Sequence, residues 1–311
     1  MKRSKAKHAD GRSLGQLSTE QVNPRSRGLD TKFALEIARI INSEDATVAA
    51  AVKRTLPQIA RAIDMIAATI DDGGRLIYVG AGTSGRIAAL DAAECAPTFG
   101  VGPKTVQFVM AGGPKALGIA VEADEDSRRL GERGIAAKKP AKKDVVVGIA
   151  ASGRTPFTVA ALQYARRKGA KTIAVACNRK SPLQKAAHLA IVIEVGPEAI
   201  AGSSRMKAGT AQKMVLNMLS SGAMTRLGYI YDGLMVNVHL RNEKLLQRGI
   251  GIVQQAAEVT RSEAERALRS AKNRVPVAIV MLKAKVSATL AVQALKGSHG
   301  NVRRAICAAR S

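Results

Sequence analysis

The chain has 311 residues, of which 49 are Lys or Arg and 24 are Asp or Glu, giving a formal charge of +25; 46% of its residues are hydrophobic. This composition excludes a disordered tail and is sufficient to bury the core of one large domain or two smaller ones. Three cysteines without CxxC spacing, and histidines without metal-ligand spacing, predict neither a disulfide framework nor a bound metal. Without a secretory signal or a membrane-length apolar run, we expect a soluble, cytoplasmic protein with no membrane partner.

The excess of positive charge raises the question of nucleic-acid binding. The basic residues are scattered over several segments, and the chain has only four Phe, four Tyr and no Trp on which bases could stack. We therefore favour a solvated basic surface over a nucleic-acid footprint, and we expect no specific nucleic-acid partner.

The predicted elements begin after a polar, basic leader at residues 1–16, which we expect to be disordered. Apolar residues at helical spacing predict one helix over residues 45–70, with a glycine stop at 73–74. Five short apolar runs follow, each flanked by turn residues and separated by helix-like stretches: residues 75–79, 106–110, 145–150, 172–176 and 190–195. Strands that alternate with helices predict a doubly wound α/β fold, with a mostly parallel five-stranded sheet flanked by helices.

The character of the sequence changes beyond the last predicted strand. Residues 208–227 predict a long buried helix, and the basic, Ala-rich segment from about residue 250 predicts a small helical subdomain. We therefore divide the chain into the leader, a domain over residues 17–247 that includes the N-terminal helices, and a helical C-terminal subdomain over residues 248–311.

A glycine-rich turn follows the first predicted strand at residues 80–86 (GAGTSGR). It satisfies the G-x-G-x-x-G pattern, but a dinucleotide site would also need an acidic residue at the end of the second strand. That strand ends in Ala111-Gly112-Gly113, so we disfavour a nicotinamide cofactor. The hydroxyls of Thr83 and Ser84, together with backbone N–H groups at a helix N-terminus, instead predict a phosphate site.

Two further hydroxyl-bearing turns have similar positions. Ser152 and Thr155 follow the third predicted strand, and residues 202–207 (GSSRMK) open the long helix. The alternative for each turn is that it only caps its helix, as Thr155 before Pro156 would do well. Three such turns, converging at the carboxyl ends of parallel strands, predict a phosphorylated sugar bound without nucleotide or metal.

Two groups of carboxylates are candidates for chemistry. Glu94 lies near the end of a mostly apolar predicted helix, where an unpaired charge is costly, so we favour an inward, functional side chain. Glu122, Glu125 and Asp126 would share one helix face, for which composition alone favours exposure to solvent.

Three long stretches of the chain resemble the N-acetylmuramic acid 6-phosphate etherases, whose core is the sugar isomerase (SIS) fold. They are RLIYVGAGTSGRIAALDAAECAPTFG (75–100), DVVVGIAASGRTP (144–156) and GSSRMKAGTAQKMVLNML (202–219). The resemblance implies cofactor-independent cleavage of the D-lactyl ether of N-acetylmuramate 6-phosphate during cell-wall recycling. It also implies a homodimer whose cleft takes residues from both chains. The related glucokinase regulatory protein provides the alternative, a non-catalytic sensor of sugar phosphates.

The resemblance also implies roles for individual residues. Glu94 is the expected acid that assists lactate departure and Glu125 the expected base at C2, although the two assignments could be reversed. The expected contacts to phosphate or sugar are Thr83, Ser84, Ser152, Thr155 and Ser204. Arg205 and Lys207 either face an anion of the substrate or cap the turn as surface cations, and a positive cleft would steer the substrate. Asp124 would raise the pKa of Glu125 if both carboxylates point inward.

Overall fold

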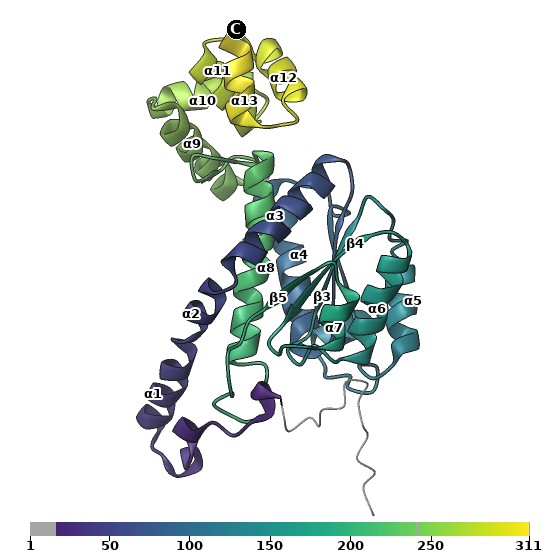
Figure 1. Ribbon diagram of the computed structural model, residues 1–311. Coiled ribbons are helices and arrows are strands. Elements are labelled where there is room, and N and C mark those ends of the chain that lie inside the picture. Colours follow the sequence, from purple (N-terminus) through teal and green to yellow (C-terminus); the bar gives the residue numbers. More distant parts are fainter. Residues whose placement is uncertain (1–16, 241, 311) are drawn as a thin grey trace, which may run out of the picture. The chain divides into compact units, whose positions relative to one another are not determined.

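The computed structural model describes residues 17–240 and 242–310, so the predicted leader lies outside the described residues (Figure 1). The chain forms two compact units. The first consists of residues up to Ala92 together with Lys104–Leu219, and the second of Ala93–Pro103 together with Ser220–Ser311. Two helices, α4 (Gly82–Phe99) and α8 (Lys207–Leu227), contribute residues to both units. The predicted boundary between residues 247 and 248, which divides the domain from the helical C-terminal subdomain, stays a prediction.

The first unit is built on a fully parallel five-stranded sheet, as predicted. Its strands are β1 (Leu76–Gly80), β2 (Val106–Met110), β3 (Val145–Ile149), β4 (Lys171–Ala176) and β5 (Leu189–Val192). They are arranged in the order β2-β1-β3-β4-β5. Every residue of β1 and β3 is buried, because these inner strands are covered on both faces and consist of uninterrupted apolar runs.

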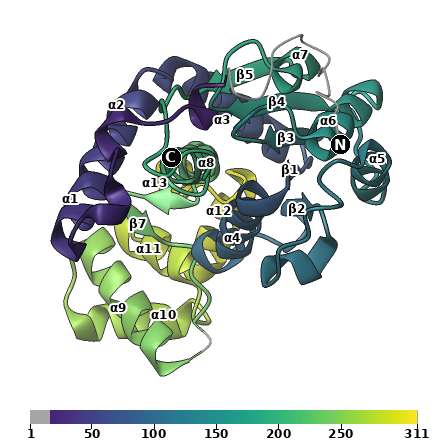
Figure 2. The ribbon, with the colours of Figure 1, turned by 90° about the horizontal axis from the view of Figure 1, so that it is seen from below.

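Helices cover the two faces of this sheet (Figure 2). One face packs against α5 (Arg128–Ala136), α6 (Pro156–Arg167) and α7 (Pro182–Ala186) around a buried cluster that includes Ile77 and Leu162. On the other face lie α3 (Leu56–Asp71) and the parts of α4 and α8 in this unit. There, Tyr78 of β1 donates its hydroxyl to Asp91 of α4 (2.8 Å), which also accepts from Asn217 of α8 (3.0 Å).

The N-terminal helical region differs from the prediction of one helix over residues 45–70. The structure has α1 (Ala34–Asp45), α2 (Val48–Lys53) and α3 (Leu56–Asp71) instead. Pro57 explains the break between the last two, because proline lacks an N–H and its ring clashes with the carbonyl four residues earlier, so it is tolerated only in the first turn of a helix.

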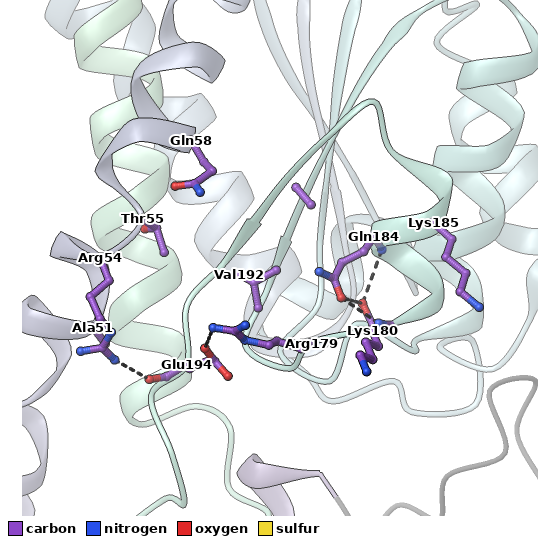
Figure 3. A pocket seen from close by; sticks show the side chains of 12 residues that line it. Ala51, Arg54, Thr55, Gln58, Arg179, Lys180, Gln184, Lys185, Val192 and Glu194 are labelled. Atoms are coloured by element: carbon purple, nitrogen blue, oxygen red, sulfur yellow. Dashed lines mark hydrogen bonds and ion pairs between the residues drawn. The ribbon is translucent and has the colours of Figure 1, made fainter.

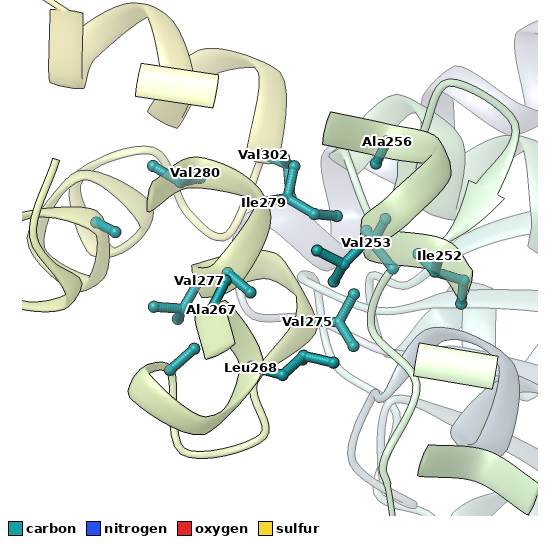
Figure 4. Close-up of a cluster of buried hydrophobic side chains, with 14 of the residues drawn as sticks. Ile252, Val253, Ala256, Ala267, Leu268, Val275, Val277, Ile279, Val280 and Val302 are labelled. Atoms are coloured by element: carbon teal, nitrogen blue, oxygen red, sulfur yellow. The ribbon is translucent and has the colours of Figure 1, made fainter. Parts of the chain in front are cut away.

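The second unit has a helical core at its C-terminal end, in agreement with the predicted subdomain. Its helices are α9 (Glu243–Ala257), α10 (Arg261–Ser270), α11 (Val275–Ala284), α12 (Ala288–Gly297) and α13 (Val302–Arg310). Figure 4 shows Val253, Leu268, Ile279 and Val302 from four of these helices in one buried cluster. A short hairpin of β6 (Ile230–Tyr231) and β7 (Leu234–Met235) precedes them.

Among the described residues, no single helix has the length and apolar composition to cross a membrane. Among these residues, only α11 and α12 taken together have the required length and apolar composition, and these two helices are bent by 107° relative to each other.

Candidate functional site

The site lies where the central strands of the first unit end. Gly80, the last residue of β1, is paired with Met110 of β2 and with Ile149 of β3, so these three strands end at the same edge of the sheet. From β1 the chain adds β2 on one side of the sheet and then β3, β4 and β5 on the other side, so the point between β1 and β3 is a topological switch point. Ligands of open α/β sheets bind at such switch points. A cavity of about 570 Å³ occupies this position.

The cavity brings together most of the predicted site. Its described lining includes the hydroxyl residues Thr83, Ser84, Ser152, Thr155 and Ser204, and the charged residues Glu20, Arg86, Glu122, Glu125 and Asp126. All three predicted hydroxyl-bearing turns therefore meet in one cavity, together with the predicted base Glu125.

The hydroxyls differ in how they are held. Ser84 donates to Gln212 of α8 (2.9 Å), and the hydroxyl of Ser152 accepts from the backbone N–H of Arg154 (3.1 Å). Thr155 occupies the N-cap position of α6, but its side chain does not cap that helix. The alternative that this turn is only a helix cap therefore does not account for its hydroxyl. The first turn of α4, which carries Thr83, adds backbone N–H groups that have no partner within the helix and favour an anion.

Glu125 lies in a turn before α5, not on a helix face as predicted. The helix begins only at Arg128, because Ser127 caps it by accepting from the N–H of Leu130 (3.2 Å). The backbone carbonyl of Glu125 accepts from the N–H of Phe157 (3.0 Å), which ties the turn to α6. Its carboxylate faces the glycine turn: a Cβ atom at Gly82 would lie 2.9 Å from Oε1 of Glu125.

The surroundings of Glu125 raise its pKa. Burial is the largest cause, and the negative charges of Asp126 and Glu122 add to it, while the guanidinium of Arg86 acts in the opposite direction. Asp124, which we expected to raise this pKa if both carboxylates pointed inward, is not among the causes of the shift.

The charge of the cavity also differs from the expectation of a positive cleft. Its described ionisable lining consists of four carboxylates, Glu20, Glu122, Glu125 and Asp126, and one guanidinium, Arg86. An anionic ligand here would therefore rely on hydroxyls, backbone N–H groups and Arg86, rather than on a field of cations. Arg86 is held by the carbonyls of the loop after β2, donating to Leu117 (3.2 Å) and Ile119 (3.1 Å).

The structure does not bring Arg205 and Lys207 into this cavity. Arg205 is exposed. Lys207 is only 3% exposed, and its ammonium lies 2.5 Å from a carboxylate oxygen of Glu44. The cation of Lys207 is therefore engaged in a buried ion pair.

Glu94 lies elsewhere and is exposed, so the expectation of a buried, inward side chain is wrong for the single chain. It belongs to the second unit, where it lines a separate cavity of about 440 Å³ with Met235, His239 and Arg248.

A third cavity, of about 610 Å³, lies beside β5 and α3 (Figure 3). It is lined by the cations Arg54, Arg179, Lys180 and Lys185. Its one described carboxylate, Glu194, is paired with Arg179 (2.6 Å). With no carboxylate available for proton transfer, this cavity is less suited to acid–base chemistry than the one around Glu125.

Sequence reasoning assigned no role to Glu20, Arg86 or Gln212. For Arg86 a signal existed, since it ends the glycine-rich motif. Gln212 also had a signal, since it lies in the quoted stretch 202–219 that opens the long helix. Glu20 lies outside all of the quoted stretches, and only folding places it beside the turns. The described part of the chain contains no group of three His, Cys, Asp or Glu side chains able to hold a metal ion.

Comparisons with known protein families agree with this fold. Residues 58–166 match the glucokinase regulatory protein N-terminal SIS domain, and residues 139–221 match the SIS domain.

Three relatives are similar over nearly the whole chain, and each bears the name N-acetylmuramic acid 6-phosphate etherase. The protein from Photorhabdus laumondii is 49% identical, over 96% of this chain and 99% of its own length. A Yersinia pestis protein is 50% identical, over 94% of this chain and 100% of its own length. A Bacillus licheniformis protein, numbered 1 in that species, is 46% identical, over 94% and 96%.

Proposed function

We propose that the chain, which belongs to the N-acetylmuramic acid 6-phosphate etherase family, cleaves the D-lactyl ether of N-acetylmuramate 6-phosphate. The products are N-acetylglucosamine 6-phosphate and D-lactate, and we assign the reaction to cell-wall recycling in the cytoplasm. The observation that carries the proposal is one cavity that joins three hydroxyl-bearing turns to a carboxylate with a raised pKa.

The reaction requires a base and an acid. In the open-chain sugar the C1 aldehyde acidifies the C2 proton, which the base removes. The C3–O bond then breaks as the acid protonates the departing lactate oxygen, leaving a C2–C3 double bond. Water adds its hydroxyl to C3 and a proton returns to C2, so one water is consumed for each ether cleaved. Each carboxyl group changes its protonation state between the two halves of the reaction.

Glu125 is suited to the role of the base. It lies in the same cavity as the proposed phosphate-binding turns, so a bound phosphosugar would be close to its carboxylate. Burial and the nearby carboxylates raise its pKa, and a base with a higher pKa takes a weakly acidic proton more readily.

The substrate's phosphate fits the uncharged donors of this cavity. Thr83, Ser84, Ser152, Thr155 and Ser204 provide hydroxyls, and the N-terminus of α4 provides N–H groups. We leave Arg205 and Lys207 out of this set, because neither lines the cavity and Lys207 already has Glu44 as its partner.

Glu94 is the proposed acid, and a homodimer is part of the proposal. In one chain Glu94 and Glu125 line different cavities. A cleft that takes residues from both subunits would allow Glu94 of the partner subunit to reach a substrate held beside Glu125.

The regulatory alternative is not favoured. The relatives named as etherases match this chain over almost its full length, whereas the regulatory-protein model matches residues 58–166.

The test is incubation with N-acetylmuramate 6-phosphate in deuterated water, following D-lactate release and deuterium at C2. We expect the wild type to release lactate and to leave one deuterium at C2 of the product. Glu125→Gln should lose both signals, because no base removes the C2 proton. Glu94→Ala should lose lactate release but retain C2 exchange in the substrate, because only departure of the lactate needs the acid.

Glu132→Gln is a matched control, since it neutralises a half-exposed carboxylate that pairs with the exposed Arg167 (3.0 Å) and does not line this cavity. It should behave as the wild type. If folded wild-type protein binds the phosphosugar but releases no lactate, the lyase proposal is wrong and the regulatory reading takes its place.

A further inference from the structure

We propose that Glu198 is a positioning residue for the substrate cavity: its buried carboxylate anchors the start of α8 and thereby places the loop that carries Gly202 and Ser204. The inference rests on the proposed function in one respect, that this cavity binds the phosphosugar. The hydrogen bonds and burial that support it do not depend on the reaction.

Glu198 is fully buried and bridges to the first turn of α8. Its Oε2 accepts from the backbone N–H of Lys207 (2.8 Å), and its Oε1 accepts from that of Ala208 (2.9 Å). Both N–H groups lack partners within the helix, and the positive end of the helix dipole favours a carboxylate. An N-cap side chain usually comes from the residue just before the helix, but here it comes from nine residues before Lys207.

This unusual separation closes a loop. Residues 199–206 leave the backbone of Glu198 and return to its side chain at Lys207, so this carboxylate closes the loop by binding its far end. Gly202 and Ser204, in the middle of the loop, line the cavity. The position of the Ser204 hydroxyl therefore depends on the bonds made by Glu198.

A second contact holds the same end of the loop. The ammonium of Lys207 pairs with Glu44 at the end of α1, and both side chains are buried. Lys207 is thus bound at its backbone by Glu198 and at its side chain by Glu44, which explains why this cation points away from the cavity.

On the cavity side, the loop has little freedom to adjust. Gly202 has a φ of +79°, and a Cβ atom there would lie 3.3 Å from a carboxylate oxygen of Glu20. Its N–H donates to the carbonyl of Thr19 (3.4 Å). If the α8 end of the loop moves, Ser204 moves relative to the other hydroxyl-bearing turns, and the cavity no longer presents its hydroxyls together to one phosphate group.

The test is Glu198→Gln, which keeps the side chain's shape but can accept only one of the two N–H groups, because its NH₂ group would face the other. We expect hydrogen exchange at the amides of Lys207 and Ala208 to become at least 10-fold faster. The phosphate contact is made in both ground state and transition state, so KM should rise about 10-fold with kcat within about 3-fold. Binding of the product N-acetylglucosamine 6-phosphate should weaken by a similar factor.

Glu194→Gln is the matched control, since it neutralises a half-exposed carboxylate four residues away that pairs with Arg179 and does not line this cavity. It should leave both hydrogen exchange and KM unchanged. If Glu198→Gln does not fold, Glu198→Asp serves instead, because its shorter carboxylate cannot reach both N–H groups.

A double-mutant cycle with Ser204→Ala separates positioning from a general loss of stability. If Glu198 acts through Ser204, the two substitutions together should raise KM little more than either alone. Fully multiplicative effects, or faster exchange with unchanged KM and product binding, would overturn the inference. Failure of the lyase proposal is recognised separately, since the wild type would then release no lactate while the exchange and product-binding measurements still decide the role of Glu198.

Discussion

The carboxylate of Glu125 lies directly against Gly82, where a Cβ atom would be 2.9 Å from Oε1. Gly82 also has a φ of +52°, a backbone conformation that residues other than glycine rarely adopt. The glycine thus allows the proposed base to approach the turn that carries the hydroxyls of Thr83 and Ser84, which are proposed phosphate contacts.

We predict that Gly82→Ala lowers kcat at least 100-fold, because the added methyl group displaces the Glu125 carboxylate from its productive position. The cost in stability should be only about 1 to 2 kcal/mol, from the strained backbone. Steady-state kinetics and urea unfolding measure the two effects. Gly73→Ala is the matched control: it has a φ of +71° and no atom within 4 Å of the added Cβ, so it should lose stability but keep its activity. Equal kinetics for the two variants would contradict the role assigned to Gly82.

Arg86→Gln should shift the acid limb of the pH–rate profile to higher pH. The guanidinium of Arg86 lowers the pKa of Glu125, whereas burial, Asp126 and Glu122 raise it. Without Arg86 this pKa rises further, and the base becomes protonated at a higher pH as the solution is acidified.

The measurement is kcat/KM against pH for the wild type, Arg86→Gln and Arg86→Lys. Because lysine retains the positive charge, its acid limb should move less than that of the glutamine variant. An acid limb that is the same in all three proteins would show that Arg86 does not influence the titrating base.

Asp144→Ala should destabilise the protein by about 3 kcal/mol or more, because it leaves the Arg75 guanidinium without its buried partner. Asp144 is fully buried. It accepts from the Arg75 side chain (2.7 and 3.0 Å) and from the backbone N–H groups of Arg75 (3.1 Å) and Ala141 (2.9 Å). These bonds join the starts of β1 and β3.

The same pair predicts a pH dependence of stability. Burial by itself would raise the pKa of Asp144, but the bonds from Arg75 and Ala141 outweigh it and hold the pKa below its usual range. The stabilisation is therefore complete above the unfolded-state pKa of about 3.9 and is lost as the pH falls through the lower folded-state value. Urea unfolding of wild type and variant between pH 7 and pH 3 should show their difference shrinking only at the acid end. A constant difference would contradict this assignment.

A heterodimer of Glu94→Ala and Glu125→Gln should regain activity that neither variant has alone. If each cleft takes Glu94 from one subunit and Glu125 from the other, one of the two clefts contains both native carboxylates. We expect about half the wild-type rate per dimer. Co-expression with two different affinity tags isolates the heterodimer, and sedimentation establishes its size. A heterodimer as inactive as its parents, or a wild type that sediments as a monomer, would contradict a shared cleft.

Local patterns in the sequence predicted much of the architecture. Uninterrupted apolar runs between turn residues identified all five strands of the sheet to within a few residues, because inner parallel strands must be apolar on both faces. The hydroxyl-bearing turns were placed correctly at one edge, because parallel strands joined by helices all end on the same side. The hairpin before α9 also had a local signal, Asp232-Gly233, which the prediction overlooked; both residues have positive φ.

Other features followed only from the tertiary structure. Glu125 enters the cavity through a turn, because Ser127 delays the start of α5. Glu94, which the sequence placed inward, is exposed in the single chain. Lys207, a candidate for substrate binding from its motif, pairs instead with Glu44, which lies 163 residues away along the chain.

There is a physical reason why some features could be predicted from the sequence and others could not. Secondary structure and turn chemistry depend on neighbours a few residues apart, so they leave periodic and compositional patterns in the sequence. The partner of a buried charge is decided by whichever opposite charge or N–H group the packed elements bring within about 3 Å, and no spacing rule links residues so far apart. The family, the sheet and the meeting of the hydroxyl-bearing turns at one edge were therefore determined by the sequence itself, whereas the surroundings of each carboxylate were decided only by folding.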